Sequence, residues 1–161
     1  MLSTVLWTLL ISMVPMIELN GAIPYAYYIG GLDIWTSSFL GVVGNILPIP
    51  IIIWLLEYVI KFMSRFKIFE KFLDWLNAKG KKAAVEIQKY KKWGLFFYVA
   101  LPGPGTGAWT GALVASLFRM RFKSAVIAIA AGCLVNGIII AVLIALGLDW
   151  VLEKFHLINK V

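Results

Sequence analysis

The sequence predicts an all-α integral membrane protein that is an inverted repeat, each half being a re-entrant helical hairpin followed by a transmembrane helix. Three observations support this fold class. Of the 161 residues, 61% are hydrophobic and 14% are charged, whereas soluble domains average about 45–50% apolar and about 25% charged residues. Two apolar stretches are interrupted by proline, glycine and polar residues. Each of them precedes an uncharged stretch long enough to cross a bilayer, which takes about 20 residues.

The most informative interruption is residues 101–112, LPGPGTGAWTGA. It cannot continue an α-helix, because Pro102 and Pro104 each remove a backbone donor and the surrounding glycines make helical backbone entropically costly. The apolar flanks, residues 93–100 and 108–118, are each too short to cross a bilayer. We therefore expect a hairpin that enters the membrane and turns back at residues 102–107. Non-helical backbone at this depth needs protein or a watered cavity around it, so the turn indicates a functional site.

The start of the chain has the same pattern. Residues 2–14 and the stretch ending at Ile29 are apolar, and between them lie Pro15, Glu18, Asn20, Gly21 and Pro24. Residues 20–26, NGAIPYA, align with residues 106–112, TGAWTGA, although few residues are identical. This first hairpin is expected to form the counterpart of the second.

The long uncharged stretches are residues 34–56 and 124–148. Pro48 and Pro50 predict a kink in the first of them. Asn45 and Asn136 lie about halfway along their spans. Two roles stay open for these asparagines: hydrogen bonding between helices, or lining a polar path.

The basic residues predict the topology. The net charge is +7, and ten of the fifteen basic residues lie between Lys61 and Lys92, which indicates a cytoplasmic segment by the positive-inside rule. Arg119, Arg121 and Lys123 add a second basic cluster, which stays inside only if residues 93–118 re-enter the membrane. We interpret Arg119 and Arg121 as topogenic anchors in preference to ligands. Both termini are then outside, and the hairpins enter from opposite sides.

These features predict a single membrane domain with four parts. They are repeat 1 (1–60), a basic amphipathic linker on the cytoplasmic membrane surface (61–92), repeat 2 (93–150) and a tail (151–161). A nucleic-acid surface is the less favoured interpretation of the linker. Cys133 and His156 are the only residues of their kinds, so neither a disulfide framework nor zinc chemistry is supported. We expect no enzyme activity, no cofactor and no metal.

Glu18 is the main candidate for chemistry. A carboxylate among apolar residues at a hairpin tip is costly to keep charged, so it is expected to be protonated part of the time, or paired. Either state suits a proton carrier. The structural alternative is that Glu18 caps a helix beginning near Ala22 or accepts hydrogen bonds from its own turn.

The second hairpin offers backbone donors at residues 105–108 and the hydroxyls of Thr106 and Thr110, at a helix start that favours an anion. Close helix packing through Gly107, Gly111 and Ala115 is an equally open interpretation. The candidate substrate-binding residues are Asn20, Gly21, Pro24, Pro102, Gly103, Gly105, Thr106, Gly107, Thr110, Asn45 and Asn136.

Residues 15–24, PMIELNGAIP, and residues 101–112 together resemble the small multidrug export protein family, over nearly the whole chain. The resemblance implies a distant relation to the DedA/VTT (SNARE-associated) membrane proteins, which are implicated in moving lipid carriers such as undecaprenyl phosphate and in proton-dependent drug resistance. Glu18 matches the acidic position of the first hairpin, and Pro102, Gly103, Gly105, Thr106 and Gly107 match the turn of the second. Many relatives are expected to have arginine where this chain has Asn20, which removes the nearest counter-ion of Glu18.

The resulting hypothesis is a homodimeric, proton-coupled transporter or flippase of the cell membrane (inner or plasma membrane). Its partners would be membrane lipids, protons and an amphiphilic or anionic substrate, with no nucleic acid. That substrate is either a lipid carrier phosphate such as undecaprenyl phosphate or a drug-like compound. In this hypothesis the two hairpin tips meet near mid-membrane. The alternative is a non-transporting membrane factor that recruits partners or anionic lipid through its basic segment.

Overall fold

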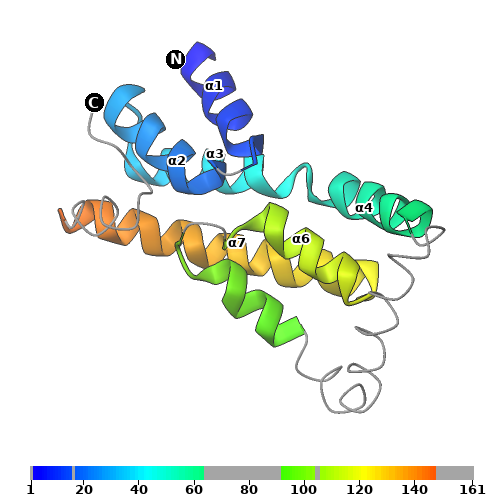
Figure 1. The fold of residues 1–161 in the computed structure, drawn as a ribbon. Helices are drawn as coiled ribbons and strands as arrows, with labels where there is room; N and C mark the ends of the chain where they lie inside the picture. Colours follow the sequence, from blue (N-terminus) through cyan, green and yellow to red (C-terminus); the bar gives the residue numbers. More distant parts are fainter. Residues whose placement is uncertain (1, 16, 64–91, 104–105, 148–161) are drawn as a thin grey trace.

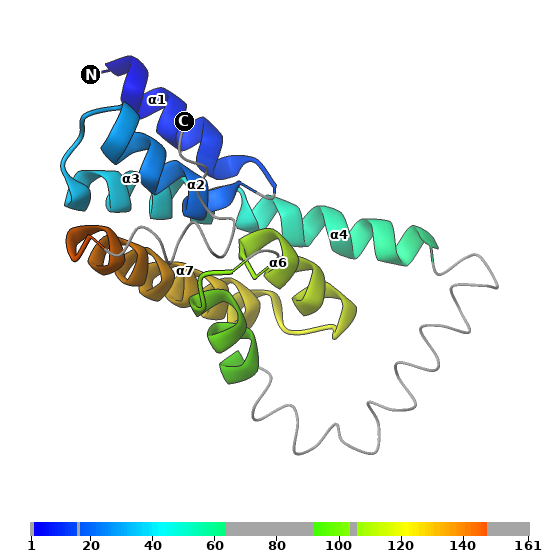
Figure 2. The same ribbon diagram turned by 60° about the vertical axis from the view of Figure 1, so that its left-hand side comes forward.

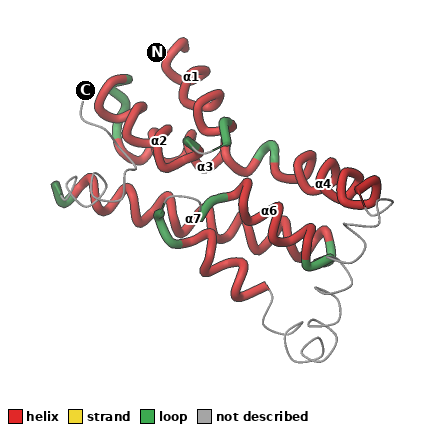
Figure 3. The backbone as a smooth tube through the Cα atoms, in the orientation of Figure 1, coloured by secondary structure: helices red, strands yellow, loops and turns green. Residues whose placement is uncertain are grey.

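The computed structural model describes residues 2–15, 17–63, 92–103 and 106–147, and these residues form helices and turns without a strand (Figure 3). In chain order the helices are α1 (Leu2–Met13), α2 (Glu18–Pro24), the π-helix η1 (Tyr25–Ile29), α3 (Ile34–Ile46), α4 (Ile49–Met63), α6 (Ala108–Leu117) and α7 (Phe122–Ala145). Residues 92–100 are also helical. The predicted all-α class is confirmed for these parts of the chain. Most of the predicted linker helix and the whole tail lie outside the described residues.

Two long apolar elements lie along each other with opposite chain directions, as Figures 1 and 2 show for α3–α4 and α7. Within the described residues, Ile34–Phe62 and Phe122–Ala145 are the stretches long and apolar enough to cross a membrane. The kink predicted from Pro48 is present, because α3 ends at Ile46 and α4 begins at Ile49. Pro48 has no N–H to donate to the carbonyl four residues before it, whereas Pro50 lies in the first turn of α4, where no such bond is needed.

The first hairpin differs from its prediction in two respects. Its turn is short, and α2 already begins at Glu18, so Asn20 and Gly21 lie inside a helix. Pro24 does not end the chain's helical course either. After it the backbone widens into η1, in which the N–H of Gly30 donates to the Tyr25 carbonyl at 2.9 Å. A proline removes one helical bond and pushes against the preceding turn, and a π-type turn accommodates both effects.

The second hairpin agrees with its predicted limits. Residues 92–100 form its first arm, residues 101–103 bend, and α6 forms its second arm. Each hairpin contacts both long elements: α1 and α2 pack mainly on α3 and α2 also contacts α7, whereas α6 contacts α4 as well as α7. Each hairpin therefore packs against the long element that follows it and also against the one that follows the other hairpin.

Asp33 fixes the start of α3. Its carboxylate accepts hydrogen bonds from the Thr36 hydroxyl at 2.6 Å and from the Thr36 backbone N–H at 2.9 Å. These two bonds favour the ionised form and hold the pKa of Asp33 below its ordinary value.

The interior is built from small residues and branched aliphatic side chains. A Cβ atom on Gly137 would lie 2.4 Å from Val42, and one on Gly41 would lie 2.6 Å from Ile23. Many of the large apolar side chains instead face outward, including Trp7, Trp35, Phe39, Trp54, Ile127 and Leu134. A surface of this kind is typical of a protein that meets lipid or another apolar partner.

Candidate functional site

Glu18 is buried at the first residue of α2, with 5% of its surface exposed. Its backbone lies in the left-handed region, with φ of 51°. That conformation is uncommon for a residue with a side chain and is one of the forms of strain found at functional sites. The turn thus holds a carboxylate where glycine would fit with less strain.

The Glu18 carboxylate caps α6 of the second hairpin. Oε2 accepts a hydrogen bond from the Ala108 N–H at 3.0 Å, and Oε1 accepts one from the Trp109 N–H at 3.2 Å. These N–H groups have no partner within their own helix, and the helix dipole favours a negative charge beside them. The structural alternative was right that Glu18 caps a helix, but that helix belongs to the other hairpin. The expected meeting of the two tips is therefore observed as a direct contact.

Gly107 makes room for this contact. A Cβ atom at this position would lie 1.5 Å from Oε2 of Glu18. The backbone there is extended, with φ of −133°, a conformation that any residue adopts, so the requirement for glycine is steric. The Gly107 N–H donates to the Thr110 hydroxyl oxygen at 3.0 Å, which completes the start of α6.

Trp109 adds a second bridge between the hairpins that the sequence interpretation missed. Its indole N–H donates to the Met13 carbonyl at 3.1 Å, and Met13 is the last residue of α1. The carbonyls of a final helical turn lack partners within the helix, so this bond satisfies one of them. A large aromatic residue with one polar atom, inside a run of small residues, is the signal in the sequence that indicates such a role.

The two asparagines occupy different places. Asn45 is buried beside Glu18, and its side chain donates to the Cys133 sulfur at 3.7 Å. Asn136 donates to the Val99 carbonyl at 3.1 Å, which the bend at residues 101–103 leaves without its helical partner. Asn136 thus joins two helices, as one of its two predicted roles requires, whereas Asn45 belongs to the Glu18 cluster.

The other predicted site residues are less closely associated with Glu18. Thr106 donates its hydroxyl to the Leu101 and Gly103 carbonyls at 2.8 and 3.0 Å, so it shapes the turn. Asn20 is buried, and its Oδ1 has no hydrogen-bond partner. The remaining ones are Pro102 and Gly103, half-buried in the bend, Gly21 and Pro24, inside α2, and Gly105, outside the described residues.

The Glu18 site thus contains a buried carboxylate on two helix-terminal N–H groups, with an amide and a thiol beside it. Such a site can bind one negative charge or release it on protonation. The N–H groups at the start of α6, where the sequence interpretation placed an anion, bind the carboxylate of Glu18 in this structure.

Comparison with known proteins gives one match. Residues 18–139 match the family model described as Putative small multi-drug export protein. The matched range begins at Glu18 and includes α6 and most of α7. No curated protein and no solved structure matches the chain.

Proposed function

The chain belongs to the putative small multi-drug export protein family, and from this premise we propose that it is a proton-coupled transporter of an amphiphilic, anionic substrate. The observation that carries the proposal is the bond between the Glu18 carboxylate and the N-terminus of α6. It places a titratable group and an anion-binding group in one buried contact between two hairpins.

The proposed mechanism is a competition for the start of α6. Ionised Glu18 holds the Ala108 and Trp109 N–H groups and keeps the hairpin tips together. Protonation removes the charge that these groups bind, so the contact weakens and the two N–H groups become available to the anionic group of a substrate. When Glu18 loses its proton again, its carboxylate displaces the substrate. One proton and one substrate charge are thereby bound together and released together at the same site.

The proposed setting is a membrane in which α3–α4 and α7 cross and both hairpins re-enter. Re-entrance and the inverted repeat are supported by the packing of α2 on α7 and α6 on α4. In this arrangement the termini are outside and the segment after α4 is cytoplasmic. Two membrane-crossing elements and two hairpins are too few to surround a transport pathway, so a second copy of the chain completes it in a homodimer. The distant DedA/VTT relation and a lipid carrier phosphate such as undecaprenyl phosphate belong to the same proposal, with drug-like amphiphiles as the second substrate class.

The test replaces Glu18 with glutamine, which keeps the side chain's shape and one acceptor oxygen but cannot exchange a proton. Asp33→Asn is the matched control, because it removes an exposed carboxylate and asparagine caps helices about as well. Purified full-length protein in proteoliposomes with an entrapped pH dye is challenged with farnesyl phosphate and, separately, with ethidium.

We expect farnesyl phosphate to drive proton flux in the native protein and in Asp33→Asn, with at least a tenfold lower rate in Glu18→Gln. If ethidium drives proton flux and farnesyl phosphate does not, the substrate would be a cationic drug and not an anionic amphiphile. Equal flux in both variants would overturn the role of Glu18. The recruiter hypothesis instead predicts no flux in any variant and binding to anionic vesicles that Glu18→Gln leaves unchanged.

A further inference from the structure

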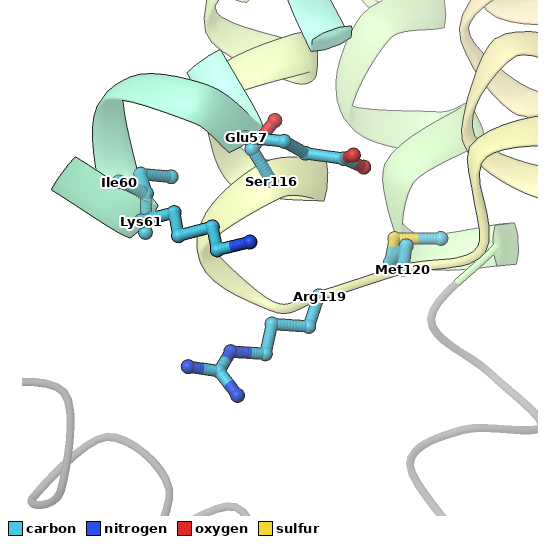
Figure 4. A pocket seen from close by; sticks show the side chains of 6 residues that line it. All are labelled: Glu57, Ile60, Lys61, Ser116, Arg119 and Met120. Carbon is cyan, nitrogen blue, oxygen red and sulfur yellow. The ribbon is translucent and has the colours of Figure 1, made fainter. Parts of the chain in front are cut away.

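A pocket with charged side chains in its lining lies at the opposite end of α6 from Glu18 (Figure 4). It is open to the surface and has a volume of about 440 Å³, and its lining residues are Glu57, Ile60 and Lys61 of α4, Ser116 of α6, and Arg119 and Met120 before α7. Because a helix rises about 1.5 Å per residue, Ser116 lies roughly 12 Å along the axis from Ala108. The pocket is therefore separate from the Glu18 contact, and its volume is in the range of small-molecule sites.

Arg119 has a left-handed backbone conformation, which is unusual for an arginine. The Arg119 N–H donates to the Ser116 carbonyl at 3.1 Å and the Met120 N–H donates to the Ala115 carbonyl at 2.9 Å, which together form a Schellman end to α6. The residue at this place needs a left-handed backbone, and Arg119 has φ of 48°. Glycine is the usual residue there because it has no Cβ to clash. Arginine is less favourable than glycine in this conformation, so its side chain is a candidate for a functional role.

The charges of the lining favour an anion. Lys61 and Arg119 are cationic and Glu57 is anionic, so the lining has one net positive charge. Glu57 and Lys61 are four residues apart on α4, the spacing at which a helix places opposite charges together. The remaining charge is that of Arg119, which is exposed and whose guanidinium extends outward in Figure 4, away from Glu57, Ser116 and Met120. Arginine binds phosphate oxygens through two parallel N–H donors.

The surroundings favour a lipid as the source of that phosphate. Ile60 and Met120 make part of the pocket wall apolar. The aromatic residues that adjoin the lining residues in sequence or in the α4 helix are exposed: Tyr58, Phe62, Phe118 and Phe122. Exposed aromatic rings beside basic side chains are typical of the level at which lipid head groups lie.

We propose that this pocket binds the phosphate of a membrane phospholipid, with Arg119 as its main ligand and the acyl chains along the exposed apolar side chains of α4. This site is independent of the proposed transport at Glu18. It assigns a binding role to the residue that the sequence suggested only as a topological anchor.

The test uses Arg119→Gly, which removes the guanidinium and at the same time suits the left-handed backbone, so the fold is preserved. Arg121→Gly is the matched control: it removes the same charge two residues away, at the N-cap of α7, where glycine is also accepted. Full-length protein in detergent is titrated with phosphatidylglycerol, with diacylglycerol and with glycerol phosphate, and bound molecules are counted by native mass spectrometry.

We expect phosphatidylglycerol to bind about tenfold more weakly to Arg119→Gly, as loss of a charge-assisted bond predicts, and within twofold of the native affinity to Arg121→Gly. Diacylglycerol, which has no phosphate, should show no specific binding to the native protein or to either variant. Equal weakening by the two glycine variants would overturn the site, because it would show a general charge effect. Binding of glycerol phosphate as tight as that of phosphatidylglycerol would overturn the lipid assignment in favour of a free-phosphate site.

Discussion

At the scale of single residues, Gly107 leaves no room for a side chain beside the Glu18 carboxylate. We predict that Gly107→Ala displaces the Glu18 carboxylate, because the added Cβ would lie 1.5 Å from Oε2 and 2.2 Å from Cδ. Glu18 would then lose two hydrogen bonds to an ionised acceptor, each worth about 1.5–3 kcal/mol. The expected fall in the free energy of unfolding is about 3–6 kcal/mol, measured by equilibrium unfolding in mixed micelles.

Gly94→Ala is the control for this substitution, because a Cβ there meets nothing within 4 Å. It should be neutral or should stabilise the helix by up to about 1 kcal/mol. The Glu18→Ala background gives the sharper comparison. In that background Gly107→Ala should have little effect, and a cost that stays the same would mean that Glu18 and Gly107 are not coupled.

At the same scale, the contrast between Glu18 and Trp109 shows what the sequence can predict. An acid among apolar residues is visible in the sequence and predicts a site. Its partners are not visible, since the donors are backbone N–H groups of Ala108 and Trp109, about ninety residues away. Backbone groups are the same in every residue, so only the packing of the two hairpins identifies the pair. The bond from Trp109 to the Met13 carbonyl escaped prediction for the same reason.

At the scale of helices, α1 packs on α3 because the backbones of the two helices approach closely. The Ser12 hydroxyl donates to the Gly41 carbonyl, and a Cβ on Gly44 would lie 2.9 Å from the Leu9 carbonyl oxygen and 3.1 Å from Leu9 Cα. These are backbone atoms and cannot rotate away. We predict that Gly44→Ala pushes α1 off α3, at an overpacking cost of about 1–3 kcal/mol.

The measurement is the free energy of unfolding together with proteolysis of the first 17 residues. Alanine is preferred to glycine in a helix by about 1 kcal/mol, so the same change at Gly94 should give the opposite sign. Because the family match begins at Glu18, α1 is the helix that the comparison does not cover. If Gly44→Ala were as stabilising as Gly94→Ala, α1 would not pack on α3 as described.

Helix limits were predictable wherever proline or glycine interrupts an uncharged stretch, as at Pro48 and Pro102. The prediction was wrong at Asn20 and Gly21, which were assigned to the break and lie in α2. Proline and glycine weaken a helix locally, but burial of Leu19, Ala22 and Ile23 stabilises this short one. The sequence analysis made no prediction of the π-helix Tyr25–Ile29 that follows Pro24.

At the scale of the whole molecule, the order of the packed elements bears on the proposed topology. The antiparallel pair of α3–α4 and α7 carries a hairpin at each end, and the hairpin turns touch between them (Figure 2). A helix of 24 residues such as α7 is about 36 Å long at 1.5 Å per residue, which is enough for the hydrocarbon core. The short hairpin arms are not.

This difference in length predicts which exposed positions share a side of the membrane. In a Cys133→Ser background, single cysteines at Ser3 and Ile29 flank the first hairpin, and those at Trp93 and Lys123 flank the second. The serine hydroxyl that replaces the thiol keeps an acceptor for Asn45, and all four test positions are exposed. Labelling of intact cells with a membrane-impermeant maleimide should modify Ser3→Cys and Ile29→Cys, whereas Trp93→Cys and Lys123→Cys should react only after the membrane is opened. Labelling of Trp93→Cys and Lys123→Cys from opposite sides would make the second hairpin an ordinary crossing. The Glu18 contact would then no longer join two re-entrant tips, and the competition proposed at the start of α6 would have to be abandoned.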